Sequence, residues 1–201
     1  MTFQKGQNPH HPPKGSSIKI EPIRTKTAIA NIKKILADKP RDLCLLTLGI
    51  NTGWRANELL SIRVGQVRGV EPGATLELKQ SKNQKYRRVT LNRTVMDSIQ
   101  RFMKQGGEEL ADNDYLFHSQ RRPVLMVPSV TRLVKSWCAI VGLKGNYGSH
   151  TLRKTWGYWQ YKRGTQLPLL VEAFGHATQQ QTLAYLCIQP REIQDVYDME
   201  L

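Results

Sequence analysis

Apolar residues recur at helical spacing over most of this chain, and this pattern predicts a largely helical protein. Between Thr27 and Ala37 the apolar positions lie three or four residues apart, as in a helix that buries one face. Pro40 suits the first turn of a second helix, whose apolar residues cover nearly all sides and therefore predict burial. Gly53 is placed to end that helix with a positive φ. Further helices are predicted at about 93–105, 128–142, 150–163, 167–174, 179–186 and 190–199.

The middle of the chain follows a different pattern, which predicts a small antiparallel sheet. Residues 75–79 alternate between apolar and polar side chains, and residues 86–91 are rich in residues that favour strands. The polar stretch 80–85 between them is typical of a hairpin tip, and Leu116-Phe117 is predicted to be a short strand. The expected fold class is therefore mainly α with a small antiparallel β-sheet (α+β).

The first residues differ in composition from the rest of the chain. Residues 1–17 are rich in Pro, Gly, Gln and Ser and hold little that could be buried. We expect a flexible basic arm over residues 1–22, followed by one folded domain over residues 23–201 that includes a C-terminal helix. No apolar signal core is visible, and no apolar run approaches the roughly 18 residues of a spanning helix. The sequence therefore predicts a cytoplasmic protein.

The net charge narrows the choice of partner. The chain has 30 Lys and Arg against 16 Asp and Glu, a formal net charge of +14. Such a charge favours a polyanionic partner, most commonly nucleic acid, although charge alone leaves a membrane- or ribosome-binding protein equally open. The three cysteines are widely spaced and odd in number, which favours ordinary thiols over a disulfide framework or a metal site.

Two basic residues stand where a helix is predicted to begin in the C-terminal half. His150 and Arg153 lie three residues apart and so share one helix face. The free N–H groups and the positive dipole of a helix start favour a phosphate there. The pair is weak evidence by itself, because a solvated helix start produces it by chance.

A histidine and a tyrosine further on can meet only if the chain breaks between them. His176 and Tyr185 are nine residues apart, which would put them on opposite sides of one unbroken helix. Gly175 suits a helix C-terminus, and the run from Thr178 to Gln181 fits a capping box that starts a new helix. The sequence therefore predicts a break that lets the two side chains approach each other.

The N-terminal half adds an arginine, a carboxylate and a lysine. Arg55 and Glu58 are expected to share one face of a short helix, either as a surface ion pair worth about 0.3 kcal/mol or as an arginine held ready to grip a phosphate. Lys82 lies at the predicted hairpin tip, where a lysine is ordinarily solvated. Here positive charge surrounds it, which suits a DNA backbone. The surrounding residues are Lys79, Lys85, Arg87 and Arg88.

The order of these candidate residues along the chain resembles that in the catalytic domain of the tyrosine recombinases, the phage integrase family. The resemblance covers about residues 20–200. The candidate residues are Arg55, Lys82, His150, Arg153, His176 and Tyr185. The family box TGxRxxELLxL is similar to residues 52–62. The second box, HxLRHT followed by LGH and Y, is similar to the segment from His150 to Tyr185. Lys154 stands where many members have a second histidine, and we include it among the expected DNA-binding residues.

The resemblance implies a site-specific recombinase or integrase that cleaves and rejoins DNA through a 3′-phosphotyrosine, with no metal or other cofactor. Tyr185 would be the nucleophile, His150 would help move its proton, and Lys82 would protonate the departing 5′-oxygen. The residues that would stabilise the charge on the phosphate are Arg55, Arg153 and His176, with Glu58 orienting the first of them.

The implied partners are double-stranded DNA, further copies of the chain in dimers or tetramers on DNA, and accessory DNA-bending proteins, in a prokaryotic or phage-derived setting. A C-terminal helix from Pro190 would pack on its own core or, as in related recombinases, on a neighbouring subunit. Residues 1–22 are too short for the N-terminal clamp domain that the family usually carries. Two alternatives stay open: type IB topoisomerase-like relaxation of DNA, and a catalytically silent DNA-binding accessory protein.

Overall fold

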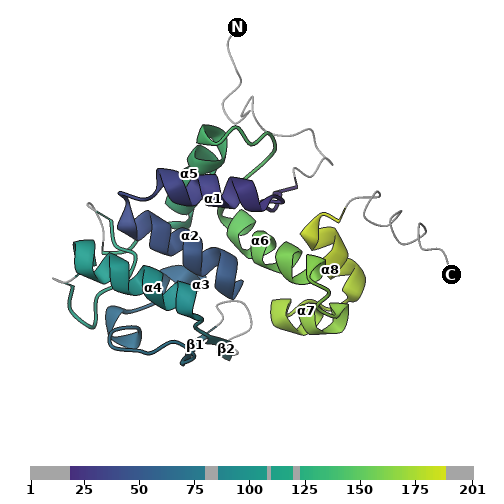
Figure 1. The fold of residues 1–201 in the computed structure, drawn as a ribbon. Helices are drawn as coiled ribbons and strands as arrows, with labels where there is room; N and C mark the ends of the chain where they lie inside the picture. The colour runs from purple at the N-terminus through teal and green to yellow at the C-terminus, as the bar shows by residue number, and fades with distance from the viewer. Residues whose placement is uncertain (1–18, 80–85, 108–109, 120–122, 189–201) are drawn as a thin grey trace, which may run out of the picture.

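Helices dominate the fold and surround the central helix α2 (Figure 1). The computed structural model describes residues 19–79, 86–107, 110–119 and 123–188. Two short turns, the 3-10 turn η1 (Val64–Gln66) and the π-helical turn η2 (Met103–Gly107), follow α3 and α4. The α-helices are α1 (Lys26–Ile35), α2 (Pro40–Thr52), α3 (Ala56–Leu60), α4 (Arg93–Phe102), α5 (Val127–Ile140), α6 (Ser149–Lys162), α7 (Leu167–Phe174) and α8 (Gln179–Leu186).

The predicted hairpin is confirmed. Strand β1 (Thr75–Lys79) pairs antiparallel with β2 (Tyr86–Thr90), with Leu76 opposite Val89. Leu76 and Leu78 face the core while their neighbours on β1 are exposed, which is the alternation that the sequence shows. The fold class is therefore mainly α with a small antiparallel β-sheet, as expected. The predicted hairpin tip at 80–85 and the predicted helix at 190–199 lie outside the described residues.

The predicted strand at Leu116-Phe117 is wrong. Both side chains are fully buried, but the two residues pair with different parts of the chain. The amide of Leu116 donates to the carbonyl of Ile62 at 2.8 Å, whereas the carbonyl of Phe117 accepts from the amide of Leu125 at 2.7 Å. Because no single neighbour runs alongside, no ladder forms. The apolar pair indicated burial and not a strand.

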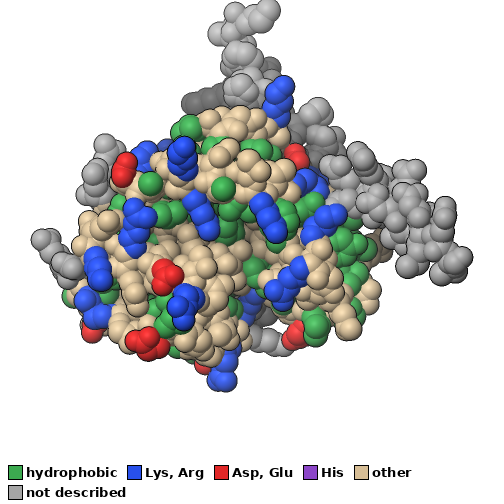
Figure 2. Space-filling view, viewed as in Figure 1, with side chains coloured by type: hydrophobic (Ala, Val, Ile, Leu, Met, Phe, Trp, Pro, Cys, Tyr) green, Lys and Arg blue, Asp and Glu red, His purple; other side chains and the backbone are tan. Residues whose placement is uncertain are grey.

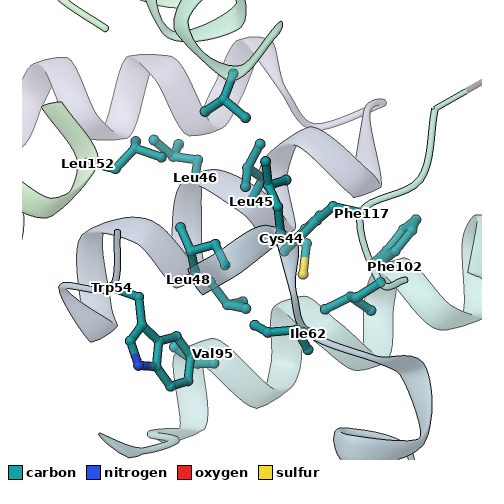
Figure 3. Close-up of a cluster of buried hydrophobic side chains, with 14 of the residues drawn as sticks. Cys44, Leu45, Leu46, Leu48, Trp54, Ile62, Val95, Phe102, Phe117 and Leu152 are labelled. Carbon is teal, nitrogen blue, oxygen red and sulfur yellow. The ribbon is translucent and has the colours of Figure 1, made fainter. Parts of the chain in front are cut away.

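Helix α2 lies at the centre of the main hydrophobic core, as its all-round apolar pattern predicted (Figure 3). Leu45, Leu46 and Leu48 are fully buried, and the helix packs against α4 and α6. Gly49 permits a close approach of α6, because a Cβ there would lie 2.7 Å from the Cβ of Leu152. This contact brings the C-terminal end of α2 against the helix that carries His150 and Arg153.

A smaller apolar cluster holds α7 and α8 to α6. Its buried members are Leu170, Phe174 and Leu186, and the partly buried Trp156 packs against them. Gly157 of α6 gives room for this contact, since a Cβ at this position would overlap the Phe174 ring. The helices that carry the second half of the expected site are thus fixed to α6 by a cluster separate from the main core.

The N-terminal segment joins the folded domain by Glu21. The amide of Glu21 donates to the carbonyl of Asn146 at 2.8 Å, and its carbonyl accepts from the hydroxyl of Thr151 at 2.9 Å. Residues 1–18, most of the expected arm, lie outside the described residues, and the division at residue 22 stays a prediction. Within the described residues, no helix is both long and apolar enough to cross a membrane.

Candidate active site

Two helix C-termini hold the arginines of the candidate site. Helix α2 ends at Gly53, whose carbonyl accepts hydrogen bonds from Arg153 and, at 3.0 Å, from Arg87. Helix α7 ends at Phe174, whose carbonyl accepts from Arg153 at 2.8 Å and from Arg55 at 3.4 Å. Carbonyls at a helix C-terminus carry the negative end of the helix dipole, which favours a guanidinium. Two backbone oxygens thereby gather three arginines that are far apart in the sequence.

Arg55 is held by a buried carboxylate. Its Nη1 lies 2.8 Å from Oε1 of Glu58, and its backbone N–H donates to Oε2 of the same side chain at 2.7 Å. The Glu58 side chain is 1% exposed and that of Arg55 22%, so this is not a surface ion pair. The pairing is confirmed, but Arg55 precedes α3 as its N-cap instead of sharing a helix face. The capping bond fixes the backbone of Arg55 together with its side chain.

His150 and Arg153 lie in the first turns of α6, as predicted. Burial lowers the pKa of the Arg153 guanidinium to about 10, and the charge of Arg87 adds to the shift. The pKa of His150 is also lowered, first by loss of water around the ring and then by the positive charges of Lys154, Arg153 and Arg55. The residue is nevertheless exposed at the surface. A ring that is neutral at pH 7 and open to solvent can accept a proton.

The predicted break between His176 and Tyr185 is confirmed. Gly175 ends α7 in the left-handed conformation with φ of 62°, and Thr178 caps α8 by accepting from the amide of Gln181 at 3.0 Å. The side chain of Gln181 reaches back to the amide just before the cap. As a result the rings of His176 and Tyr185 lie 5.0 Å apart, centre to centre, with 72° between their planes.

The phenol of Tyr185 is half-buried in an aromatic and cationic setting. Its ring packs edge-on against Phe174 at 5.2 Å, and the ammonium of Lys154 lies 4.6 Å from the ring centre. Burial raises the pKa of Tyr185, and the positive charges of Arg153 and Arg55 partly oppose the rise. The phenol is therefore protonated at neutral pH, and it needs a proton acceptor before it can act as a nucleophile.

Lys154 lies beside the candidate nucleophile. The residue is only 7% exposed, and its ammonium donates to the sulfur of Cys187 at 3.4 Å. The described cations of the hairpin divide in two: Lys79 and Arg88 are exposed, whereas Arg87 turns inward to the carbonyls of α2. Contact of any of these residues with DNA stays a prediction. Lys82 and Lys85 lie outside the described residues.

Sequence reasoning missed one polar residue of the site. Thr182 of α8 is fully buried, and its hydroxyl oxygen lies 2.9 Å from Nδ1 of His176. Its position four residues after Thr178 places it on the inner side of a short helix, which is the only signal that the sequence offers.

The described part of the site suits an anion. Around Tyr185 the described side chains supply four cations and one carboxylate: Arg55, Arg87, Arg153, Lys154 and Glu58. Guanidinium groups match the geometry of phosphate oxygens and bind them in pairs. Among the described residues, no three His, Cys, Asp or Glu side chains gather into a group able to hold a metal ion. The arrangement can bind a phosphate beside a tyrosine hydroxyl.

Comparisons with known proteins show which sequences and folds this chain is similar to. The chain matches the model of the Phage integrase family over residues 22–192. It is 30% identical over 172 residues to the probable integrase/recombinase YoeC of Bacillus subtilis, covering 84% of this chain and 90% of that protein.

Solved structures share the fold. The crystal structure of XerA recombinase aligns with a TM-score of 0.73 at 19% identity, over 88% of this chain and 64% of that one. The XerH site-specific recombinase bound to palindromic difH substrate aligns with a TM-score of 0.72 at 21% identity, over 91% of this chain and 52% of that one. The chain thus spans nearly all of YoeC but less than two thirds of these two proteins.

Proposed function

Because the chain belongs to the phage integrase family of tyrosine recombinases, we propose that it cleaves and rejoins double-stranded DNA at specific sites through a bond between Tyr185 and a 3′-phosphate. The observation that carries this proposal is the position of Tyr185, whose ring lies 5.0 Å from His176 and within the field of Arg153 and Arg55. A nucleophile is thereby held beside groups that bind phosphate.

The reaction proceeds by exchange of one phosphoester bond for another. The oxygen of Tyr185 attacks phosphorus, a bond from tyrosine to the 3′-phosphate forms, and the bond to the 5′-oxygen breaks. His150 takes the proton of the phenol, for which its lowered pKa and its exposed ring suit it. The departing 5′-oxygen takes a proton from Lys82, which lies outside the described residues. The covalent bond conserves the energy needed for rejoining, and no step calls for a metal.

The arginines stabilise the charge that develops on the phosphate. Arg55 and Arg153 each hold a backbone carbonyl in the free protein, and the incoming phosphate oxygens take over part of their hydrogen bonds. His176, which lies between α7 and α8, adds a further donor to the phosphate. Loss of either arginine by substitution with alanine costs about 3 kcal/mol of barrier, the scale of one lost oxyanion donor.

The wider surface supports DNA as the substrate. Figure 2 shows Lys and Arg side chains spread over the viewed face, with fewer acidic ones between them. A surface of this kind attracts the DNA backbone irrespective of sequence. XerH, whose fold this chain shares, was solved bound to its difH substrate. We include self-association on DNA in the proposal, since recombination joins two duplexes.

Covalent trapping tests the proposed function. The full chain is incubated with a library of nicked duplexes and quenched with detergent, and DNA-linked peptides are mapped by mass spectrometry. We expect an adduct on Tyr185, none in Tyr185→Phe, and an unchanged adduct in Tyr86→Phe, which removes an exposed tyrosine of the hairpin. DNA binding without any adduct would contradict the proposal. Adducts on every sequence, together with relaxation of supercoiled DNA, would point to a topoisomerase instead.

A further inference from the structure

Besides its edge contact with the Tyr185 ring, His176 has a ring stack and a side-chain hydrogen bond that together set its orientation. Its ring stacks on Phe174 with 5.0 Å between centres and 15° between planes. Its Nδ1 lies 2.9 Å from the hydroxyl oxygen of Thr182, a side chain with no exposure to solvent. The stacking sets the plane of the imidazole, and the hydrogen bond sets its rotation within that plane.

The direction of this hydrogen bond follows from the alternatives open to the threonine proton. The hydroxyl of Thr182 has one proton and two acceptors in reach: Nδ1 of His176 at 2.9 Å and the carbonyl of Thr178 at 3.4 Å. Hydrogen bonds from a hydroxyl to an oxygen measure about 2.7–2.8 Å, so the contact with the Thr178 carbonyl is the weaker of the two. The same carbonyl already accepts the amide of Thr182 at 3.3 Å. The proton therefore points to Nδ1.

An imidazole that accepts at Nδ1 carries its own proton on Nε2 when it is neutral. We propose that Thr182 is a positioning residue that fixes His176 as the neutral Nε2–H tautomer, so that the ring presents an N–H donor to the phosphate without being charged. The site already holds Arg55, Arg153 and Lys154, and a neutral donor adds no further repulsion among them. The assignment of the tautomer rests on the contacts of His176 alone, whereas donation of its Nε2–H to a phosphate rests on the proposed function.

Nitrogen NMR tests the tautomer directly and without DNA. In the full chain labelled with ¹⁵N-histidine at pH 8, we expect His176 to show a protonated Nε2 and an unprotonated Nδ1. In Thr182→Val, which keeps the branched shape and removes the hydroxyl, we expect a mixture of the two tautomers. Thr182→Ser keeps the hydroxyl and the wild-type pattern. A proton on Nδ1 of His176 in the wild-type chain overturns the inference, whatever the variants do.

Kinetics of covalent trapping test the consequence. At saturating DNA, Thr182→Val lowers the rate of adduct formation on Tyr185 on the order of tenfold, a part of what the loss of a whole oxyanion donor costs. DNA affinity stays the same, and Thr182→Ser restores the rate. In a His176→Ala background, Thr182→Val has no further effect, because its action passes through the ring.

The experiments distinguish failure of the proposed DNA cleavage from failure of the positioning role of Thr182. If the wild-type chain has the Nε2–H tautomer but forms no adduct, the proposed function fails and the assignment of the tautomer stands. If adducts form and Thr182→Val is as fast as wild type, or slows the His176→Ala variant further, the positioning role of Thr182 is overturned. Equal midpoints of urea unfolding for Thr182→Val and Thr182→Ser ensure that a slower rate does not reflect loss of the fold.

Discussion

The ammonium of Lys154 lies 4.6 Å from the centre of the Tyr185 ring and 3.4 Å from the sulfur of Cys187. A cation over the face of a partly desolvated aromatic ring stabilises the pair by about 1 kcal/mol. The lysine thus joins α6 to the helix that carries the candidate nucleophile. It also contributes to the lowered pKa of His150, after burial.

Substitution of Lys154 by methionine should raise the pKa of His150. Met keeps the apolar stem of the side chain and removes the charge, while burial, the larger cause of the shift, remains. We therefore expect the pKa to move toward 6.5 without reaching it, as measured by NMR titration of the His150 ring. An unchanged pKa would contradict the electrostatic role of Lys154.

The lowered pKa of His150 also makes the free energy of unfolding depend on pH. Because the pKa of His150 is lower in the folded protein than in the unfolded chain, the unfolded chain binds more protons in the window just below pH 6.5. The contribution of His150 to the free energy of unfolding is present above that pH and is lost as the pH falls through the folded pKa. His150→Gln should lack this loss, and Lys154→Met should show a smaller one, in urea unfolding at pH 7.5 and 5.

Gly53→Ala should destabilise the protein far more than Gly69→Ala. Both glycines have similar positive φ angles, 62° and 68°, so both variants lose about 1 kcal/mol to backbone strain. A Cβ at Gly53 also overlaps the Trp156 ring, whereas a Cβ at Gly69 meets nothing within 4 Å. We expect a total loss of about 3 kcal/mol at Gly53, measured by urea unfolding. Equal losses of stability in the two variants would show that α6 shifts to accommodate the added Cβ at no cost.

Glu58→Ala should cost about 2–3 kcal/mol of stability and lower the cleavage rate. It leaves the backbone N–H and the guanidinium of Arg55 without their shared acceptor in a partly buried place. Asp112→Ala is the matched control, since it removes the carboxylate of an exposed pair with Arg68 and should cost less than about 1 kcal/mol. Similar costs for the two variants would mean that Glu58 acts as an ordinary surface partner.

Arg87→Ala and Arg88→Ala should differ although the residues are neighbours on β2. Arg87 donates to the carbonyls of Gly53 and Thr52, so its loss should lower the cleavage rate more than DNA affinity. Arg88 is exposed, so its loss should weaken DNA binding and reduce the slope of log K against log salt by about 1. Binding titrations over a range of salt and trapping kinetics separate the two effects. The reverse pattern would exchange the roles assigned to the two residues.

The features that the sequence predicted well are those set by neighbouring residues. The positive φ of Gly175 and the cap at Thr178 depend on a few adjacent positions, and they sufficed to predict that His176 meets Tyr185. Helix positions followed from apolar spacing for the same reason.

The features that the sequence left hidden depend on segments that meet only after folding. The contact of Arg87 with DNA stays a prediction, but its inward hydrogen bond could not be foreseen, because the carbonyl of Gly53 lies 34 residues earlier in the chain. The burial of Lys154 depends on Cys187, 33 residues later. Leu116 and Phe117 look like a strand because burial and strand formation favour the same residue types.

The small size of the cluster of Leu170, Phe174 and Leu186 affects which part of the protein unfolds locally. Helices α7 and α8 rest on these few side chains, whereas α2 lies in the large core, so we expect amide hydrogens of α8 to exchange through openings that leave α2 closed. Each such opening withdraws Tyr185 and also removes the Phe174 carbonyl from Arg55 and Arg153. The candidate nucleophile and the carbonyl oxygen that binds both arginines are therefore expected to leave the site together when α8 opens.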